Sequence, residues 1–468
     1  MAATYTTVDP TTGAPLATHA LLDGAALEAA LARAADAFAR HRQTPFAERA
    51  EKLNRLADLL EREKRQHAER MVREMGKPIT QAVAEAEKCV LGCRYYAEHA
   101  ARFLADEPRA TEADRSVVAY EPLGPVLAVM PWNFPYWQVF RFAAPAVMAG
   151  NVGLLKHAKN VLACGDAIAD LFREAGFAEG VFQHLPVETD QVERIVRDPR
   201  VAAATLTGSE GAGRAVATAA ADSLKKTVLE LGGSDAFVVL ADADLDHAVE
   251  IGVTARVQNN GESCIAAKRF ILEKPIAEAF ARRFTDAMAA LQVGDPMDEA
   301  TQVGPLARKD LRDEVHGQVE RAVAEGAEVL TGGRIPDGPG FFYPPTVLAN
   351  VREGTVAFDE EIFGPVASLV AAEDADDAVR LANASRFGLG GAVFTRDVAK
   401  GERVARALAC GSAFVNAMVR SHPNVPFGGV KASGYGRELG PEGIREFVNV
   451  KTLWVEHGRG SGKPMAAE

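Results

Sequence analysis

The chain has 468 residues, too many for a single hydrophobic core, and its length therefore predicts two or three domains. Hydrophobic residues make up 48% of it and charged residues 25%, which is the balance of an ordinary globular protein. The net charge is −12 and no block of Lys and Arg occurs, which argues against a nucleic-acid partner and an anionic membrane surface. No apolar run approaches the ~20 residues of a membrane span.

The cysteines indicate a reducing compartment. Five in so long a chain do not make a disulfide framework, and the N-terminus lacks the charged and apolar regions of a signal peptide, so we expect a cytoplasmic protein. Cys89 and Cys93 lie four residues apart in a helical pattern and in principle could begin a metal site. No His/Cys pair at zinc spacing follows them, so two small residues on a helix face are the favoured reading, and no metal is expected.

The predicted elements change character along the chain. Residues 24–105 have the 3.6-residue periodicity of three long helices. From about residue 117, short apolar strands alternate with helical stretches, which predicts an α/β fold with a parallel sheet. A second α/β series follows Gly232 and Gly233, and this Gly-Gly step is a plausible domain hinge.

A cysteine lies in the stretch "NNGESCIAAKR", residues 259–269, which follows a helical segment. A turn at Gly261 could expose Cys264 and lower the pKa of its thiol through backbone amides. The neighbouring carboxylate of Glu262 is expected to oppose this by raising that pKa. From the pattern alone, Cys264 is either a small loop residue or a nucleophile.

Two further motifs carry polar side chains. Asn133 in "PWNFP" is held between prolines, where its amide could donate to a developing oxyanion, although Asn is also a common turn former. Glu230 in "LELGG" ends a predicted strand, where apolar neighbours would raise its pKa and suit it to be a general base. A solvated Glu at the end of a strand is the alternative.

A glycine-rich turn follows another predicted strand in "TLTGSEGAGRAV". Its glycines (Gly208, Gly211 and Gly213) do not match the dinucleotide-binding fingerprint, so the motif by itself is weak. A Gly/Ser turn that leads into a helix nevertheless offers amides and a hydroxyl to a phosphate, as many short strand-to-helix turns do.

Together these motifs resemble the aldehyde dehydrogenase superfamily. "PWNFP", "LLKHAK", "GSEGAG", "LELGG", "GESC", "EIFGPV" and "PFGGVKASGYGRELG" occur in the order of that family, from about residue 5 to 456. The resemblance implies a Rossmann-like NAD(P)-binding domain (1–106 and 123–232), an α/β catalytic domain (233–440) and a small β oligomerisation arm (107–122 and 441–456). It also implies a homodimer or homotetramer.

The resemblance implies a role for each motif. Cys264 would be the nucleophile, Asn133 and the Cys264 backbone amide the oxyanion hole, and Glu230 the general base. A Glu at the "LELGG" position favours hydrolysis of the acyl group over its transfer to coenzyme A. The residues expected at the cofactor are Trp132, Lys156, Gly208, Ser209, Gly213, Glu361 and Phe363.

The chain departs from the family pattern at two positions. Glu262 stands where Gln is more common, which could alter thiol reactivity. Lys159 stands where NAD-preferring members have a Glu that binds the ribose 2′-hydroxyl. A cation there could attract a 2′-phosphate, so NADP is the expected cofactor, with NAD as the alternative. If Lys159 instead points to solvent, it has no role in cofactor choice.

The substrate expectation depends on Arg141 in "YWQVFRF" and on Ser421, next to Arg420, in "NAMVRSHPNVPFGG". The pattern resembles enzymes of this family that act on succinic semialdehyde, in which the matching Arg and Ser hold the distal carboxylate. Arg141 could instead pair with a nearby acid and fix its helix. Another aldehyde substrate (glutarate semialdehyde, or general aliphatic or aromatic aldehydes) and a non-catalytic relative remain as alternatives.

Overall fold

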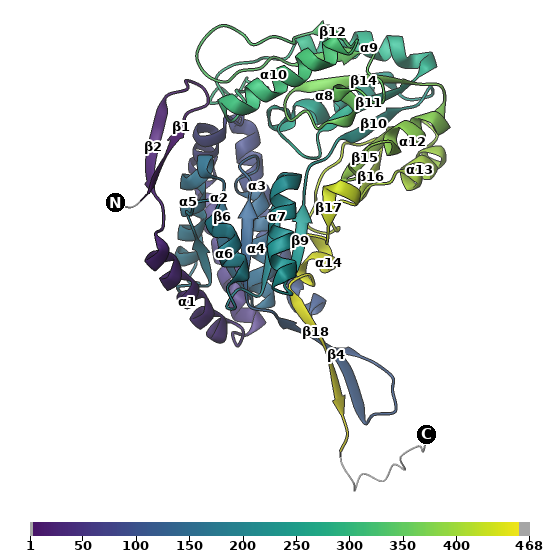
Figure 1. The fold of residues 1–468 in the computed structure, drawn as a ribbon. Coiled ribbons are helices and arrows are strands. Elements are labelled where there is room, and N and C mark those ends of the chain that lie inside the picture. The colour runs from purple at the N-terminus through teal and green to yellow at the C-terminus, as the bar shows by residue number, and fades with distance from the viewer. Residues whose placement is uncertain (1–2, 458–468) are drawn as a thin grey trace.

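The computed structural model describes residues 3–457 (Figure 1). Two α/β bodies lie one above the other, and a thin ribbon formed by β4 (Arg115–Pro122) and β18 (Val448–Val455) projects away from both. The α/β fold class predicted from the sequence is confirmed. No helix within residues 3–457 is long and apolar enough to cross a membrane.

The first segment of the chain is a hairpin followed by three long helices. The hairpin strands are β1 (Thr4–Val8) and β2 (Pro15–Ala20), and the helices are α1 (Gly24–His41), α2 (Phe46–Met75) and α3 (Ile79–Phe103). Asp23 caps α1 by accepting from the amides of Ala25 and Ala26, and Gly76 ends α2 with a φ of 77°. The three helices lie where the periodicity predicts them.

The first body contains a six-stranded sheet in the order β17-β9-β8-β5-β6-β7. All neighbouring pairs are parallel except β17 with β9. The strands are β5 (Pro125–Met130), β6 (Val152–His157), β7 (Phe182–His184), β8 (Ala203–Thr207), β9 (Lys226–Glu230) and β17 (Gly434–Tyr435). The helices are α4 (Trp137–Ala149), α5 (Leu162–Glu174), α6 (Gln191–Arg197) and α7 (Glu210–Asp222), with the 3-10 turn η1 (Lys159–Val161).

The second body contains a seven-stranded sheet in the order β12-β13-β14-β11-β10-β15-β16, with only β12 antiparallel to its neighbour. Its strands are β10 (Asp235–Val239), β11 (Ala267–Glu273), β12 (Glu328–Thr331), β13 (Thr346–Ala349), β14 (Val366–Ala372), β15 (Gly390–Phe394) and β16 (Ser412–Val415). Its helices are α8 (Leu245–Val257), η2 (Gln258–Gly261), α9 (Lys274–Ala289), α10 (Lys309–Ala324), α11 (Val356–Asp359), α12 (Ala375–Asn383) and α13 (Val398–Ala407).

The projecting ribbon is a three-stranded sheet in the order β18-β4-β3, and we call it the arm. Its short third strand is β3 (Glu107–Pro108), and β18 pairs with β4 over its whole length. Before β18 the chain forms η3 (Lys431–Ser433) and α14 (Gly440–Ile444).

The Gly-Gly step between the bodies is pinned by a distant segment. β9 ends at Glu230 in the first sheet and β10 begins at Asp235 in the second. The Ser433 hydroxyl donates to the Gly232 carbonyl (2.6 Å), and the Leu231 amide donates to the Ser433 carbonyl (3.0 Å). Strand β17 follows at once and pairs with β9, so the step between the sheets is held in a fixed conformation.

Candidate active site

A cavity of about 240 Å³ lies at the carboxyl ends of β5, β8 and β9. Parallel α/β sheets bind ligands at this edge. The lining brings together residues from distant motifs, among them Trp132, Asn133, Ser209, Cys264, Glu361 and Phe363. With Gly208, seven of the site residues predicted from the sequence thus line one cavity.

Cys264 reaches this cavity from a tightly bent loop. Asn259 and Asn260 both have a φ of 58° and Gly261 has a φ of 76°, so the chain turns sharply before the cysteine. A Cβ at Gly261 would overlap the backbone of Gly364, which explains why glycine is required there. The thiol is half-buried, and burial raises its pKa to about 12, while Arg141 and Lys268 lower it.

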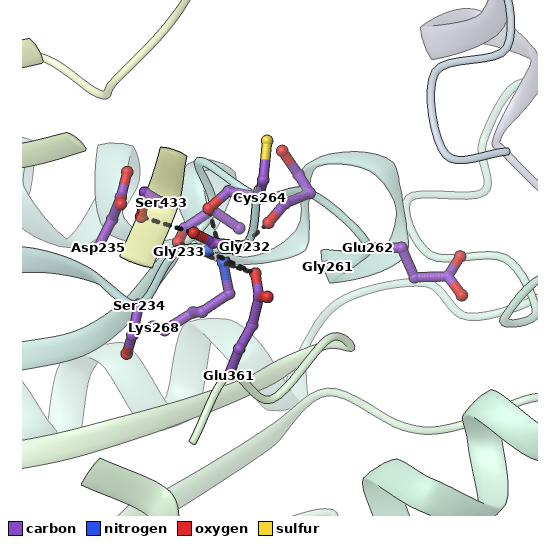
Figure 2. A network of polar contacts seen from close by, with 12 residues as sticks. Gly232, Gly233, Ser234, Asp235, Gly261, Glu262, Cys264, Lys268, Glu361 and Ser433 are labelled. Carbon is purple, nitrogen blue, oxygen red and sulfur yellow. Dashed lines mark hydrogen bonds and ion pairs between the residues drawn. The ribbon is translucent and has the colours of Figure 1, made fainter. Parts of the chain in front are cut away.

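Glu262 does not act on the thiol as the sequence analysis expected. Its carboxylate is buried and directed away from Cys264, and Oε1 accepts from the Ala307 amide at 3.0 Å (Figure 2). Burial raises the pKa of Glu262 itself. The acids that raise the Cys264 pKa are instead Glu361 and Asp235.

Asn133 is buried beside the cysteine loop. Its Nδ2 donates to the Glu262 carbonyl (3.1 Å), and Asn259 Nδ2 donates to the carbonyls of both Asn133 and Glu262 (2.8 Å each). An amide nitrogen carries two hydrogens, so the second N–H of Asn133 remains for a ligand. Asn259 therefore fixes the distance between the two segments that supply the thiol and the amide.

Lys268 ties the cysteine loop to Glu361 (Figure 2). Its ammonium donates to the carbonyls of Ser263 (2.9 Å) and Cys264 (2.8 Å), and lies 3.2 Å from Glu361 Oε1. The same carboxylate oxygen accepts from the Gly233 amide at 3.1 Å. A Cβ at Gly232 would collide with this carboxylate, so the Gly-Gly step makes room for Glu361.

Glu230 lies behind the cavity wall, whereas its neighbours Leu231 and Gly232 line the cavity. Its side chain is 2% exposed, and within the described part of the chain neither carboxylate oxygen has a hydrogen-bond partner. Burial raises its pKa well above the ordinary value, Glu438 raises it further, and Arg141 lowers it. A Cβ at Gly428 would lie 2.7 Å from Glu230 Oε1, so the carboxylate packs against the backbone of Gly428, where no side chain would fit.

Arg141 is engaged by other side chains of the protein. It forms a buried ion pair with Glu438, donates to Gln138 Oε1 (2.6 Å), and stacks over Phe427 with its Cζ 4.7 Å from the ring centre. This is the pairing that the sequence analysis held as the alternative to a substrate contact. Ser421 is also buried, and its Oγ accepts from Lys88 Nζ (2.8 Å) and from Trp137 Nε1 (3.0 Å).

The glycine-rich turn places only part of its motif at the cavity. Gly208 and Ser209 line it, and Ser209 caps α7 by accepting from the Ala212 amide at 3.4 Å. Gly213 is buried one turn further along, where a Cβ would lie 2.6 Å from Leu231 Cδ2. Its observed contact is therefore close packing of α7 on the chain after β9. Across the cavity, the rings of Trp132 and Phe363 meet edge to face, 5.8 Å apart.

Lys156 and Lys159 lie beyond the cavity lining, near the end of β6. Lys156 is buried, and desolvation together with the Lys159 charge lowers its pKa. Lys159 forms an ion pair with Glu188 and lies 5.6 Å from the centre of the Tyr5 ring. It therefore does not simply point to solvent, and Glu188 competes for its charge.

The sequence analysis missed three charged side chains near the site: Lys88, Lys268 and Glu438. Lys268 follows Cys264 by four residues and could have been noticed as a cation close to a thiol. Lys88 and Glu438 contact Ser421 and Arg141 across more than 290 positions of sequence, and no local pattern signals such partners.

The fold and this cavity define an α/β protein with a cysteine and a side-chain amide at the edge of a parallel sheet. The profile described as "Aldehyde dehydrogenase family" matches residues 1–453. The chain therefore belongs to the aldehyde dehydrogenase family.

Relatives with known names are similar over nearly the whole length. "Succinate-semialdehyde dehydrogenase [NADP(+)]" of Mycolicibacterium paratuberculosis is 54% identical over 96% of this chain and 96% of its own. A protein of the same name, numbered 1, from Mycobacterium tuberculosis is 54% identical over 96% and 99%. The crystal structure of succinic semialdehyde dehydrogenase from Streptococcus pyogenes in complex with NADP+ superposes with a TM-score of 0.95, at 36% identity over 97% and 100%.

Proposed function

We propose that the protein oxidises succinic semialdehyde to succinate with NADP as the oxidant. The observation that carries this proposal is that the thiol of Cys264 and the amide of Asn133 line the same cavity as the turn at Ser209 and the carboxylate of Glu361. The names of the relatives supply the substrate and the cofactor. The residues supply the chemistry.

The thiol is the atom that bonds to the substrate. Cys264 Sγ gives its proton to a base and attacks the aldehyde carbon, and the resulting oxyanion accepts from the free N–H of Asn133 and from the Cys264 amide. Loss of one such donor typically slows the reaction 10²- to 10³-fold, or about 3–4 kcal/mol. Loss of the hydrogen on that carbon, with its electron pair, leaves a thioester.

Glu230 is proposed to release the product. A carboxylate whose pKa is raised by burial is suited to take a proton from water, which then attacks the thioester, frees the acid and restores the thiol. Because Glu230 lies behind the cavity wall, this role requires its side chain to turn into the cavity. A carboxylate without hydrogen-bond partners loses no such contact in that movement.

The residues at and around the cavity suit a nicotinamide dinucleotide. The N-terminus of α7 with Ser209 offers amides to a pyrophosphate, the Glu361 carboxylate offers acceptors to ribose hydroxyls, and Trp132 and Phe363 offer flat apolar surfaces. Lys156 and Lys159 would hold the adenosine ribose and its 2′-phosphate, with Lys159 leaving Glu188 for the phosphate. When bound, the cofactor supplies the acceptor for the substrate's electrons.

The deciding experiment is a steady-state panel of aldehydes, each measured with NADP and with NAD. We expect succinic semialdehyde with NADP to have the highest kcat/KM, and Lys159→Glu to shift the cofactor preference toward NAD by 10-fold or more, because a carboxylate repels the 2′-phosphate. A higher kcat/KM for an uncharged or longer aldehyde would contradict the proposed substrate. An unchanged cofactor ratio in Lys159→Glu would contradict the role of that lysine.

We also propose a cytoplasmic homodimer or homotetramer. All five cysteines are free, as expected in a reducing compartment. The arm supports assembly, because β18 is an edge strand and carries the exposed apolar side chains of Val450, Trp454 and Val455.

A further inference from the structure

A second cavity, of about 440 Å³, lies between α3, α4 and α8. This second cavity and the cavity at Cys264 are both lined by residues of the same two segments, 133–138 and 257–264. Phe134, Trp137 and Gln258 face the second cavity, whereas Asn133, Gln138 and Cys264 face the first. The second cavity therefore lies across these two segments from the cavity proposed to hold the cofactor.

Lys88 on α3 lines this second cavity without an acidic partner. Its ammonium donates to Ser421 Oγ (2.8 Å) and lies 4.5 Å from the centre of the Trp137 ring. Among residues 3–457 no carboxylate forms an ion pair with it, and the adjacent acid, Glu85, is paired with Lys77. An ammonium has three N–H donors, so Lys88 keeps capacity for an anion.

The two carboxylates that line the same cavity are both paired with other cations, Glu85 with Lys77 and Glu299 with Arg65. Burial lowers the pKa of Lys88 to about 8; Arg141 and Arg420 also lower it, and Cys89 and Glu85 raise it. Of the two guanidinium groups, Arg141 is neutralised by Glu438. Lys88 is thus a half-buried cation that faces an open cavity and has Arg420 as a second positive charge nearby. Such an arrangement favours a bound anion.

Ser421 adds a directed donor at the same place. A hydroxyl has two acceptor lone pairs and one proton, and the lone pairs of Ser421 Oγ already accept from Lys88 and Trp137. Within the described chain no acceptor takes its proton. The buried hydroxyl is thus left with a donor for an incoming oxygen.

We propose that Lys88 binds the distal carboxylate of the aldehyde substrate, together with the hydroxyl of Ser421. The inference deepens the proposed function and rests on it, since it assigns the recognition of a short ω-carboxylated aldehyde to a lysine on α3. Arg141, held by Glu438, shapes the site and adds positive potential.

The test compares succinic semialdehyde with butanal, which has the same number of carbons and no carboxylate. In Lys88→Met we expect kcat/KM for succinic semialdehyde to fall about 10- to 100-fold, mainly through KM, because a charged hydrogen bond is lost. The value for butanal should stay within about 2-fold. Lys88→Arg should retain most of the activity on the semialdehyde.

A control variant and a binding measurement separate recognition from folding. Arg94→Met removes a cation from the same helix, but Arg94 is exposed and paired with Asp58, so both substrates should be unaffected. Succinate should raise the Tm of the wild type and of Arg94→Met, and should fail to raise that of Lys88→Met.

The outcomes distinguish the two proposals. Equal losses on both substrates in Lys88→Met, or an undiminished Tm rise with succinate, would overturn the role of Lys88 while leaving the proposed function intact. A wild type that oxidises butanal as well as the semialdehyde, and gains no Tm from succinate, would overturn the proposed function and this inference together.

Discussion

The thiol of Cys264 lies in surroundings that keep it protonated at neutral pH. Burial raises its pKa to about 12, and the cations Lys268 and Arg141 do not offset this. The reactive form is the thiolate, so attack on an aldehyde must be accompanied by loss of the proton to a base.

Alkylation of the enzyme without cofactor or substrate measures this directly. Because the pKa of Cys264 is raised, the rate of its reaction with iodoacetamide should climb about tenfold per pH unit from pH 7 to 10. An unperturbed thiol, with a pKa of about 8.5, should level off within this range. Mass spectrometry of the Cys264 peptide, with glutathione as the reference thiol, gives both curves; a plateau for Cys264 below pH 9 would refute the raised pKa.

At the scale of elements, β11 and the loop before it act as one unit. Lys268, at the second position of the strand, donates to two carbonyls of the loop and contacts Glu361. The strand therefore sets both the position of the nucleophile and that of a residue proposed to bind the cofactor.

The substitution Lys268→Met should affect both Cys264 and Glu361. We expect a KM for NADP several-fold higher, because Glu361 loses its cation, and slower alkylation of Cys264 at each pH, because a charge that lowers its pKa is gone. The loss of donors to buried carbonyls should reduce the free energy of unfolding by about 1–3 kcal/mol. Lys274→Met, at the exposed start of α9 directly after this strand, is the control. Alkylation of Lys268→Met as fast as that of the wild type would contradict the coupling.

The sequence was informative about elements and less so about contacts between them. The helices of residues 24–105 and the strands that precede "WNFP", "GSEGAG" and "LELGG" were predictable, because periodicity and turn residues are local properties. The partners of Arg141, Lys159 and Glu262 were not, because Glu438, Glu188 and Ala307 come from elsewhere in the chain. The direction of the Glu262 side chain depends on the left-handed residues at 259–261, which no periodicity encodes.

At the scale of the whole molecule, the arm is the feature whose apolar side chains and strand edge a single chain leaves uncovered. Three strands that project from the body bury little apolar surface by themselves. The outer edge of β18 retains unpaired backbone groups, which a second copy could pair with.

Replacement of the exposed apolar residues of the arm should therefore change the assembly. The double variant Val450→Glu with Trp454→Glu is expected to sediment as a smaller species than the wild type, because charges would be buried at the interface between copies. Val398→Glu, at an exposed position on α13, should leave the mass unchanged. An unchanged sedimentation coefficient for the double variant would place the interface elsewhere.

The pairing of β17 with β9 has a consequence for synthesis of the chain. On the ribosome, strands β5 to β9 of the first sheet can pair once about half of the protein has emerged. The outer edge of β9 has no partner strand until residues 434–435 appear. During that interval an exposed strand is open to wrong partners. Slow translation of the second half should therefore increase aggregation of the nascent protein. A chaperone that binds exposed strands should reduce this aggregation.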